Sequence, residues 1–326
     1  MPVLLDFHFC GGRVEALVAL MNIYPGYSFK RILLKGFNAL NQVGPRLLPK
    51  KLSQIGCAER ALPELGPNDT RAFLLHKIDQ NGRFYVVDQH AGGGSRAITK
   101  LALNEKAAKG IRHEAKVLNL LAGRTSFDVP RVLSFESWNG GCALRTSAVS
   151  QNRKAHKKCH PLPDSLFTAI ADLRSKTLPN ELPAAQIEGW NGARGRVRTP
   201  EICKAAMEIN PETFFSVSAA HRDLGSENIF SCKSASAISE FTLIDWEFFT
   251  ETAPTLTDRV GVWLGCRHRT LKGSRNVGVS SLAAEFLADF ECAPGGAPAA
   301  VVALLHLSDL GIDLARILIG DARGPA

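Results

Sequence analysis

Turn-forming segments between residues 71 and 149 constrain the fold of this chain more than any other feature. DQNGR at 79–83 and HAGGGS at 90–95 separate three short apolar or alternating runs, AFLLHKI, FYVVDQ and RAITKLAL. Runs of this kind between strong turn signals are typical of strands, and their simplest arrangement is an antiparallel three-stranded meander. Asn139-Gly140-Gly141 then separates PRVLSFESW from CALRTSAV, which predicts one further hairpin.

Helical periodicity begins after the meander. Residues 105–121 place Ile111, Ala115, Leu118 and Leu121 on one stripe, which predicts an amphipathic helix. Helices are also expected at 164–174, 200–209 and near 298–319, short strands at 228–230 and 241–245, while 175–199 shows no clear pattern. The predicted fold class is α+β, with a small antiparallel-sheet N-terminal lobe that carries one key helix and a larger, mainly helical C-terminal lobe.

Three parts are expected along the chain: an N-terminal extension (residues 1–69), the sheet-and-helix lobe (70–150) and the helical lobe (151–326). Within the extension, residues 28–40 place Phe29, Ile32 and Leu33 on one helical face and basic side chains mainly on the other. A basic amphipathic helix can lie on a membrane surface, so peripheral membrane contact stays open. Packing against the body of the protein is the simpler interpretation.

Composition is that of an ordinary globular protein, with 326 residues and 45% in the hydrophobic set, enough for one large core or two smaller ones. The formal net charge of +8 suggests an anionic ligand without choosing between nucleotides, nucleic acids and acidic membranes. The 8 cysteines are scattered, which fits a reducing compartment. With neither a signal peptide nor a run of about 20 apolar residues, we expect a cytoplasmic protein.

The strongest chemical signal is HRDLGSENIF at residues 221–230, followed by LIDWEFF at 243–249. Transfer of a phosphoryl group from ATP requires an aligned acceptor oxygen and neutralised phosphate charge. Asp223 is a candidate to orient a hydroxyl and accept its proton. Asn228, across a tight loop, and Asp245, after the next strand, supply the oxygen ligands that magnesium prefers.

This pattern, H-x-D-x-x-x-x-N and then an apolar strand ending in D-W-E, resembles the aminoglycoside phosphotransferase and choline kinase superfamily, which has a protein-kinase-like fold. The resemblance implies Asp223 as catalytic base and Asn228 with Asp245 as magnesium ligands. It implies that His221 supports the catalytic loop, and Arg222 matches a position that is often basic in related kinases. The stretch PTLTD at 254–258 is similar to the family segment in which an aspartate begins a helix and has a structural role.

A kinase-like N-terminal lobe also needs a lysine on its third strand to contact the α- and β-phosphates, and a glutamate on the next helix to hold it. Lys100 lies in RAITKLAL, the third run of the meander, and Glu114 lies in the helix that follows. An exposed Lys–Glu pair would add little to stability, so an inward-facing pair would indicate a function. We therefore expect Lys100, held by Glu114, to bind the nucleotide.

Several other segments leave alternatives open. No G-x-G-x-x-G precedes the first strand, and either the 79–83 or the 90–95 loop is a candidate to cover the phosphates. The adenine site is expected near residues 145–149. The basic run at 152–158 could steer an anionic substrate or nucleotide, and a solvated loop is the preferred interpretation. The basic clusters at 194–198 and 267–269 lack interleaved aromatics, so surface charge is preferred to a nucleic-acid site. His156, Cys159 and His160 are too few for a zinc site.

The predicted function is an ATP- and Mg²⁺-dependent phosphotransferase that acts on a hydroxyl of a small molecule. The alternative is a catalytically weak, nucleotide-binding relative with a scaffold or regulatory role. Neither the acceptor nor the oligomeric state can be read from the sequence.

Overall fold

The computed structural model describes residues 9–10, 69–75, 83–90, 95–102, 104–138, 140–149, 153–156, 161–232, 237–273 and 276–321. Two compact units divide the chain. The first contains Met1–Ala122 and Val129–Lys154, and the second contains Gly123–Asp128 and Ala155–Ala326. The main change of unit thus falls between residues 154 and 155. Helix 28–40 of the predicted extension lies outside the described residues.

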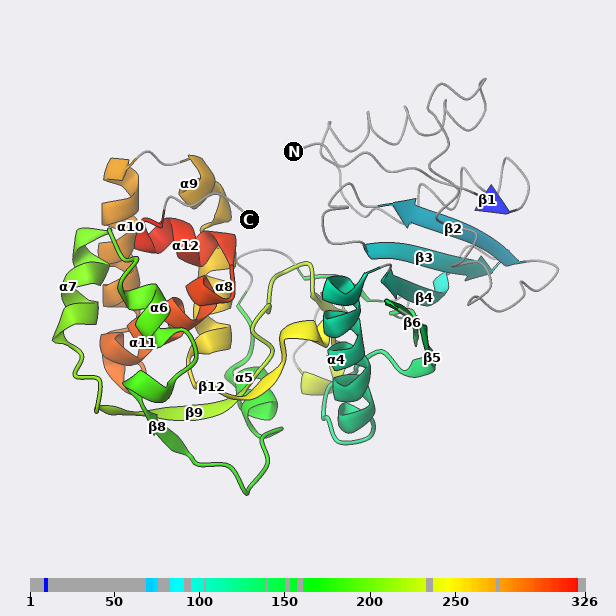
Figure 1. The fold of residues 1–326 in the computed structure, drawn as a ribbon, viewed down its shortest axis with the longest axis horizontal. Helices are drawn as coiled ribbons and strands as arrows, with labels where there is room; N and C mark the ends of the chain where they lie inside the picture. Colours follow the sequence, from blue (N-terminus) through cyan, green and yellow to red (C-terminus); the bar gives the residue numbers. More distant parts are fainter. Residues whose placement is uncertain are drawn as a thin grey trace. The chain divides into compact units, whose positions relative to one another are not determined.

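The first unit is built on a six-stranded antiparallel sheet with the strand order β1-β2-β3-β4-β6-β5 (Figure 1). Its strands are β1 (Phe9–Cys10), β2 (Asp69–Leu75), β3 (Arg83–His90), β4 (Ser95–Ala102), β5 (Val132–Trp138) and β6 (Gly141–Ser147). The predicted meander and the predicted hairpin are both confirmed. The hairpin is added through its second strand, because β6 pairs with β4. Residues 9–10 of the N-terminal extension pair with β2.

Helix α4 (Glu105–Leu121) covers one face of this sheet through β4 and β6, and its bounds match the prediction. It begins where the Asn104 side chain accepts a hydrogen bond of 2.8 Å from the Ala107 N–H, a satisfied N-cap. Its buried stripe includes Ile111, Leu118 and Leu121, which are 1–2% exposed. Glu114 lies among these apolar residues, so a carboxylate is buried in the interface of helix and sheet.

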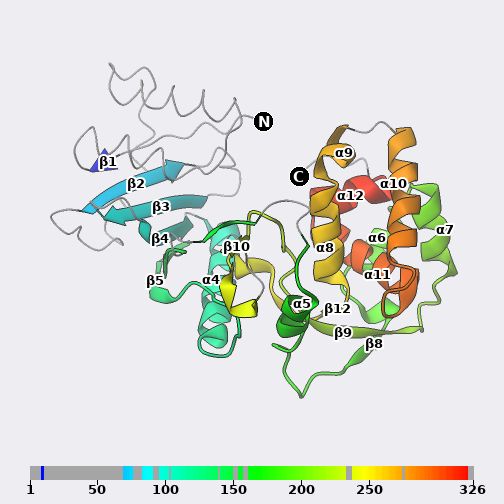
Figure 2. The same ribbon diagram turned by 180° about the vertical axis from the view of Figure 1, so that it is seen from behind.

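The second unit is mainly helical and also contains two small sheets (Figure 2). Its helices are α5 (Asp164–Ala171), α6 (Trp190–Arg194), α7 (Pro200–Glu208), α8 (Thr257–Cys266), α9 (His268–Gly273), α10 (Asn276–Asp289), α11 (Gly296–Asp309) and α12 (Asp313–Ile319). Helix α11 is buried among its neighbours α6, α7, α8, α10 and α12. The core around it includes Trp190, Trp263 and Phe286.

Strands of two small sheets flank the loop at residues 221–228 in the sequence. One sheet has the order β12-β9-β8, formed by β12 (Thr250–Pro254), β9 (Phe214–Ala220) and β8 (Glu181–Pro183). The other has the order β11-β10-β7, with β11 (Phe241–Leu243), β10 (Ile229–Ser231) and β7 (Lys154–Ala155). Strands β10 and β11 were expected, and their antiparallel pairing is confirmed.

Two expectations for this unit need correction. The helix expected near 298–319 is two helices, because Gly311 adopts a φ of +88° and the amides after α11 bond back to carbonyls of that helix. The sheet of β8, β9 and β12 was not expected, because its strands lie far apart in the sequence and one of them comes from the stretch 175–199. Among the described helices, none is both long and apolar enough to cross a bilayer. The predicted α+β class is confirmed: the described part of the first unit has the antiparallel sheet and helix α4, and the second unit is larger and mainly helical.

Candidate active site

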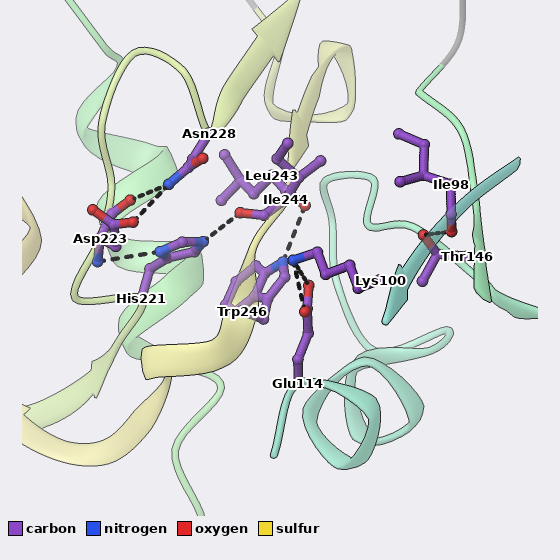
Figure 3. Close-up of polar contacts among 10 residues, drawn as sticks. All are labelled: Ile98, Lys100, Glu114, Thr146, His221, Asp223, Asn228, Leu243, Ile244 and Trp246. Atoms are coloured by element: carbon purple, nitrogen blue, oxygen red, sulfur yellow. Dashed lines mark hydrogen bonds and ion pairs between the residues drawn. The ribbon is translucent and has the colours of Figure 1, made fainter. Parts of the chain in front are cut away.

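The loop that follows β9 carries the predicted catalytic residues, and His221 anchors its first position. The His221 ring is fully buried, and its Nε2 lies 2.9 Å from the carbonyl oxygen of Ile244 (Figure 3). A carbonyl only accepts, so Nε2 carries the proton, and Nδ1 accepts from the Asp223 N–H at 3.3 Å. Trp246 packs on the imidazole with ring centroids 4.6 Å apart. His221 thereby joins the loop to the end of β11.

Asp223 and Asn228 are brought together across the tight loop. The amide nitrogen of Asn228 donates to Oδ2 of Asp223 at 3.0 Å and to the Asp223 carbonyl at 2.8 Å (Figure 3). The Gly225 N–H also donates to that carbonyl. Because Asn228 donates through its nitrogen, its side-chain oxygen is left as an acceptor for a cation. The asparagine backbone bonds Ile244 as well, through the Ile244 N–H at 3.0 Å.

Asp245 is close enough to Asp223 for the two carboxylates to interact electrostatically. Burial raises the pKa of Asp223 to about 7, and the negative charge of Asp245 acts in the same direction. The hydrogen bond from Asn228 opposes this shift, while Glu227 and Glu247 add to it. The structure therefore gathers four carboxylates around this loop.

Asp258 holds the backbone of the same loop from the start of α8. Its Oδ2 accepts from the His221 N–H and its Oδ1 from the Arg222 N–H, each at 2.9 Å. The side chain is buried, and burial raises the pKa of Asp258 while the two donors and nearby positive charge act in the opposite direction. This is a structural role for the aspartate of PTLTD, in which a helix N-terminus fixes two loop amides.

Arg222 turns its side chain to partners on three other segments. Its Nε donates to the Phe248 carbonyl, and its Nη1 bonds a carboxylate oxygen of Glu188 and lies 3.4 Å from Nε2 of His306. Each of these partners is a protein group. Glu188 and His306 carried no sequence signal, because they lie 34 and 84 positions from Arg222. Phe127, which stacks on Trp246, was missed for the same reason.

Lys100 and Glu114 form a close ion pair within the first unit. The lysine Nζ lies 2.8 Å from Oε1 and 2.7 Å from Oε2 of Glu114. Figure 3 shows the two side chains pointing toward each other. The side chains are 15% and 3% exposed, so both ions are largely removed from water. Burying an ion pair costs desolvation energy that its attraction repays only with good geometry. A pair that faces inward is therefore a candidate for function, and its role toward a nucleotide stays a prediction.

The second-unit residues fit a magnesium ion bound together with a nucleotide. Asp245 and Asn228 offer carboxylate and amide oxygens, and the repulsion between Asp223 and Asp245 is what a cation at this place would relieve. Among the described residues, no group of three or more histidine, cysteine or acidic side chains could hold a metal by itself. Magnesium in such sites keeps waters and phosphate oxygens, so it needs few protein ligands.

The remaining candidate segments are only partly visible. Residues 79–82 and 91–94 of the two phosphate-loop candidates lie outside the described residues, as do Cys159 and His160 of the weak zinc candidate. Of the basic stretch 152–158, His156 donates its backbone N–H to the Ile229 carbonyl. Arg196 pairs with Asp309 and Asp321, and Arg267 pairs with Glu285 and Asp289. These arginines serve the fold of the helical unit.

Comparison with known proteins gives similarity at the level of structure. No protein-family model matches the chain, and no curated protein matches its sequence. It is similar to the GDP and kanamycin complex of APH(2'')-IIIa, with 11% identity, a TM-score of 0.46, and coverage of 80% of this chain and 90% of that chain. An aminoglycoside 3'-phosphotransferase of type VIII gives 18% identity and 0.43, with coverage of 78% and 98%.

A macrolide 2'-phosphotransferase from Brachybacterium faecium is a further similar structure, with 13% identity, a TM-score of 0.35, and coverage of 76% of this chain and 80% of that chain. Identities and TM-scores at this level leave the activity to be inferred from the residues of the chain itself.

Proposed function

We propose that this protein is an ATP-dependent phosphotransferase that moves the γ-phosphoryl group to a hydroxyl of a small molecule. The observation that carries the proposal is the cluster of Asp223, Asn228 and Asp245, in which Asn228 is buried and the pKa of Asp223 is raised to about 7. A carboxylate with this pKa is half ionised near neutral pH, where a general base is most effective. An ordinary surface turn would not bring two repelling carboxylates together.

In the proposed reaction each residue of the chain has one task. The oxygen of the acceptor hydroxyl attacks the γ-phosphorus while Asp223 accepts the hydroxyl proton. The bond from phosphorus to the ADP oxygen breaks in the same reaction. Asn228 holds the Asp223 carboxylate in place and, with Asp245, would hold Mg²⁺. Bound Mg²⁺ supplies neutralisation of the negative charge on the phosphates. Lys100, fixed by Glu114, would bind the α- and β-phosphates.

The surroundings of Asp223 also bear on the acceptor. Glu227 and Glu247 add negative charge near Asp223, although the whole chain is net basic. Such a field disfavours an anionic acceptor and favours a neutral polyol or a cationic alcohol. A panel of hydroxylated metabolites in these three charge classes, assayed with ATP and with GTP, would identify both substrates.

Two alanine variants test the assignment. Asp223→Ala should lower turnover by at least about 100-fold and largely spare nucleotide binding, because the base acts only on the acceptor. Asp245→Ala should lose magnesium-dependent nucleotide binding as well, since a ligand of the metal is removed. Titration calorimetry with ATP and Mg²⁺ measures the binding, and a coupled ADP assay measures turnover.

Glu208→Gln, which changes an exposed carboxylate of α7, is the matched control and should leave both quantities unchanged. Turnover that survives in both alanine variants would reject the assignment. Binding of MgATP by the wild type without turnover of any acceptor would instead favour the catalytically weak, nucleotide-binding alternative.

A further inference from the structure

A polar cluster lies beside the proposed catalytic loop and takes no part in the reaction described above. The side chains of Arg222 and His306 are largely buried in it, and that of Glu188 is 60% exposed. The centre of the cluster is the Arg222 guanidinium, which is 11% exposed. The partners come from three places: the Phe248 carbonyl at the end of the D-W-E-F-F segment, the carboxylate of Glu188 before α6, and the ring of His306 on α11. The cluster therefore connects the loop with elements far away in the sequence.

The His306 ring joins two of these partners to each other. Its Nδ1 lies 2.8 Å from the Glu188 carbonyl oxygen, which can only accept, so Nδ1 carries the proton. Its Nε2 is then the acceptor that faces Nη1 of Arg222 at 3.4 Å. The side chain is 1% exposed, and burial lowers the pKa of His306, with the charge of Arg222 acting in the same direction. A neutral ring suits both contacts.

The position of Arg222 gives these contacts a consequence for the active site. Arg222 directly precedes Asp223, and its φ of +69° is a conformation that a non-glycine residue adopts only at some cost. Its side chain fixes Phe248, which follows Asp245 by three residues. His221 and Asn228 bond Ile244, which precedes Asp245. The segment of Asp245 is thus tied to the catalytic loop on both sides, and Arg222 makes the second tie.

We propose that His306 and Glu188 are positioning residues that act through Arg222 to hold Asp223 and Asp245 at their working separation. The inference rests on the proposed function for its effect on catalysis, and on the observed contacts alone for its effect on the loop. Misplacement of a reacting group by about 1 Å can cost about 100-fold in rate. Loss of the cluster should therefore reduce kcat more than it changes KM.

A pair of substitutions at His306 separates the two contacts of the ring. His306→Gln places an amide oxygen where Nε2 was and can still accept from Arg222, whereas His306→Asn replaces only the Nδ1 position. Ser308→Ala, on the same buried helix, removes a hydroxyl that bonds the Leu305 carbonyl and serves as control. We expect kcat to fall about 10- to 100-fold in His306→Asn, less in His306→Gln, and little in Ser308→Ala, with KM for ATP within about 3-fold.

Equal losses in His306→Asn and His306→Gln, or losses no larger than in Ser308→Ala, would overturn the inference. So would a change confined to KM. Glu188→Gln gives a second test from the other partner, since it keeps the backbone carbonyl for His306 and weakens the bond to Arg222. Glu188→Gln should lower kcat, as His306→Asn does.

Hydrogen exchange provides a readout that needs no turnover. The amides of Gly225 and Asn228 are bonded within the loop, to the carbonyls of Asp223 and Gly225. They should exchange at least about 10-fold faster in His306→Asn than in Ser308→Ala. A wild type that turns over no acceptor would defeat the proposed function and leave this measurement decisive for the loop. Unchanged exchange at both amides would overturn the positioning role.

Discussion

At the scale of single residues, the backbone is least ordinary beside the proposed chemistry. Within the described part of the chain, Arg222 and Asp245 are the two non-glycine residues with positive φ, at +69° and +67°. Such conformations persist only where the surroundings over-determine them. For Arg222 the surroundings are the carboxylate of Asp258 at its N–H and three partners at its side chain. These backbone conformations lower the stability of the fold, and they place the side chains of Asp223 and Asp245.

The raised pKa of Asp223 also reflects a cost to the stability of the folded protein, and it gives a prediction about stability. Its pKa of about 7 in the folded protein exceeds that of an unfolded aspartate. Its contribution to stability is therefore fully present below the unfolded pKa and is lost as the pH rises through about 7. Asp223→Asn, which keeps an acceptor for Asn228, should abolish turnover and raise the unfolding free energy of the ligand-free protein at pH 8 by on the order of 2 kcal/mol.

Urea unfolding at pH 8 and pH 4 checks this expectation. The gain should shrink toward pH 4, where the wild-type carboxyl is protonated in the folded state and partly protonated in the unfolded state, and Glu208→Gln should show no comparable pH dependence. A gain that is equal at both pH values would mean that the charge of Asp223 is not its cause. In the wild type, turnover should rise with pH through the pKa of Asp223, because only the ionised carboxylate accepts a proton.

At the scale of elements, sequence patterns predicted an element where all the signals for it lie within one short stretch of the chain. Helix α4 shows its apolar stripe and its N-cap within one stretch, and the Asn139-Gly140-Gly141 turn marks the hairpin of β5 and β6. Strand β9 was missed because its partners β8 and β12 lie far from it in the sequence, one before it and one after it. No hairpin turn between adjacent runs therefore indicated these pairings. The break between α11 and α12 depends on a single glycine, Gly311, within an apolar stretch.

The same distinction applies to the candidate site. Asp223, Asn228 and Asp245 were predicted because their chemistry requires a short loop and the strand after it, and the structure gathers them. Lys100 and Glu114 were predicted from a strand followed by a helix, and they form an ion pair. Glu188 and His306 meet Arg222 only through the packing of α6 against α11, which no local pattern encodes.

This contact between α6 and α11 can be tested at one glycine. Gly189 precedes α6 with a φ of +84°, and an added Cβ would lie 2.5 Å from the Cβ of Asp309 on α11. Gly189→Ala should therefore lower the unfolding free energy by about 1–3 kcal/mol, from the strained φ and the overlap. Urea denaturation measures the change.

Gly195 at the other end of α6 is the natural comparison. It has a φ of −67° and nothing within 4 Å of an added Cβ, so Gly195→Ala should be neutral or stabilise by up to about 1 kcal/mol. Equal midpoints for the two alanine variants would show that the close approach of α6 and α11 does not constrain residue 189.

At the scale of the whole molecule, the predicted site residues are divided between two compact units. Lys100 and Glu114 belong to the first, and Asp223, Asn228 and Asp245 belong to the second. The proposed reaction requires both sets of residues to act on one nucleotide. If the two sets had unrelated roles, they would not depend on the same nucleotide. A ligand that binds only the folded state stabilises it by about 2.7 kcal/mol at 100 times its Kd. Thermal unfolding with ATP and Mg²⁺ can therefore report on both sets together.

The variants Lys100→Met and Asp245→Asn, singly and combined, make the test. If both residues hold the same MgATP, each single change should remove most of the upward shift in Tm caused by the nucleotide, and the double variant should lose little more, because coupled residues are not additive. Lys106→Met, at an exposed position of α4, controls for the loss of a positive charge and should keep the shift. Two partial losses that simply add in the double variant would show independent effects, and the two units would then not share a nucleotide.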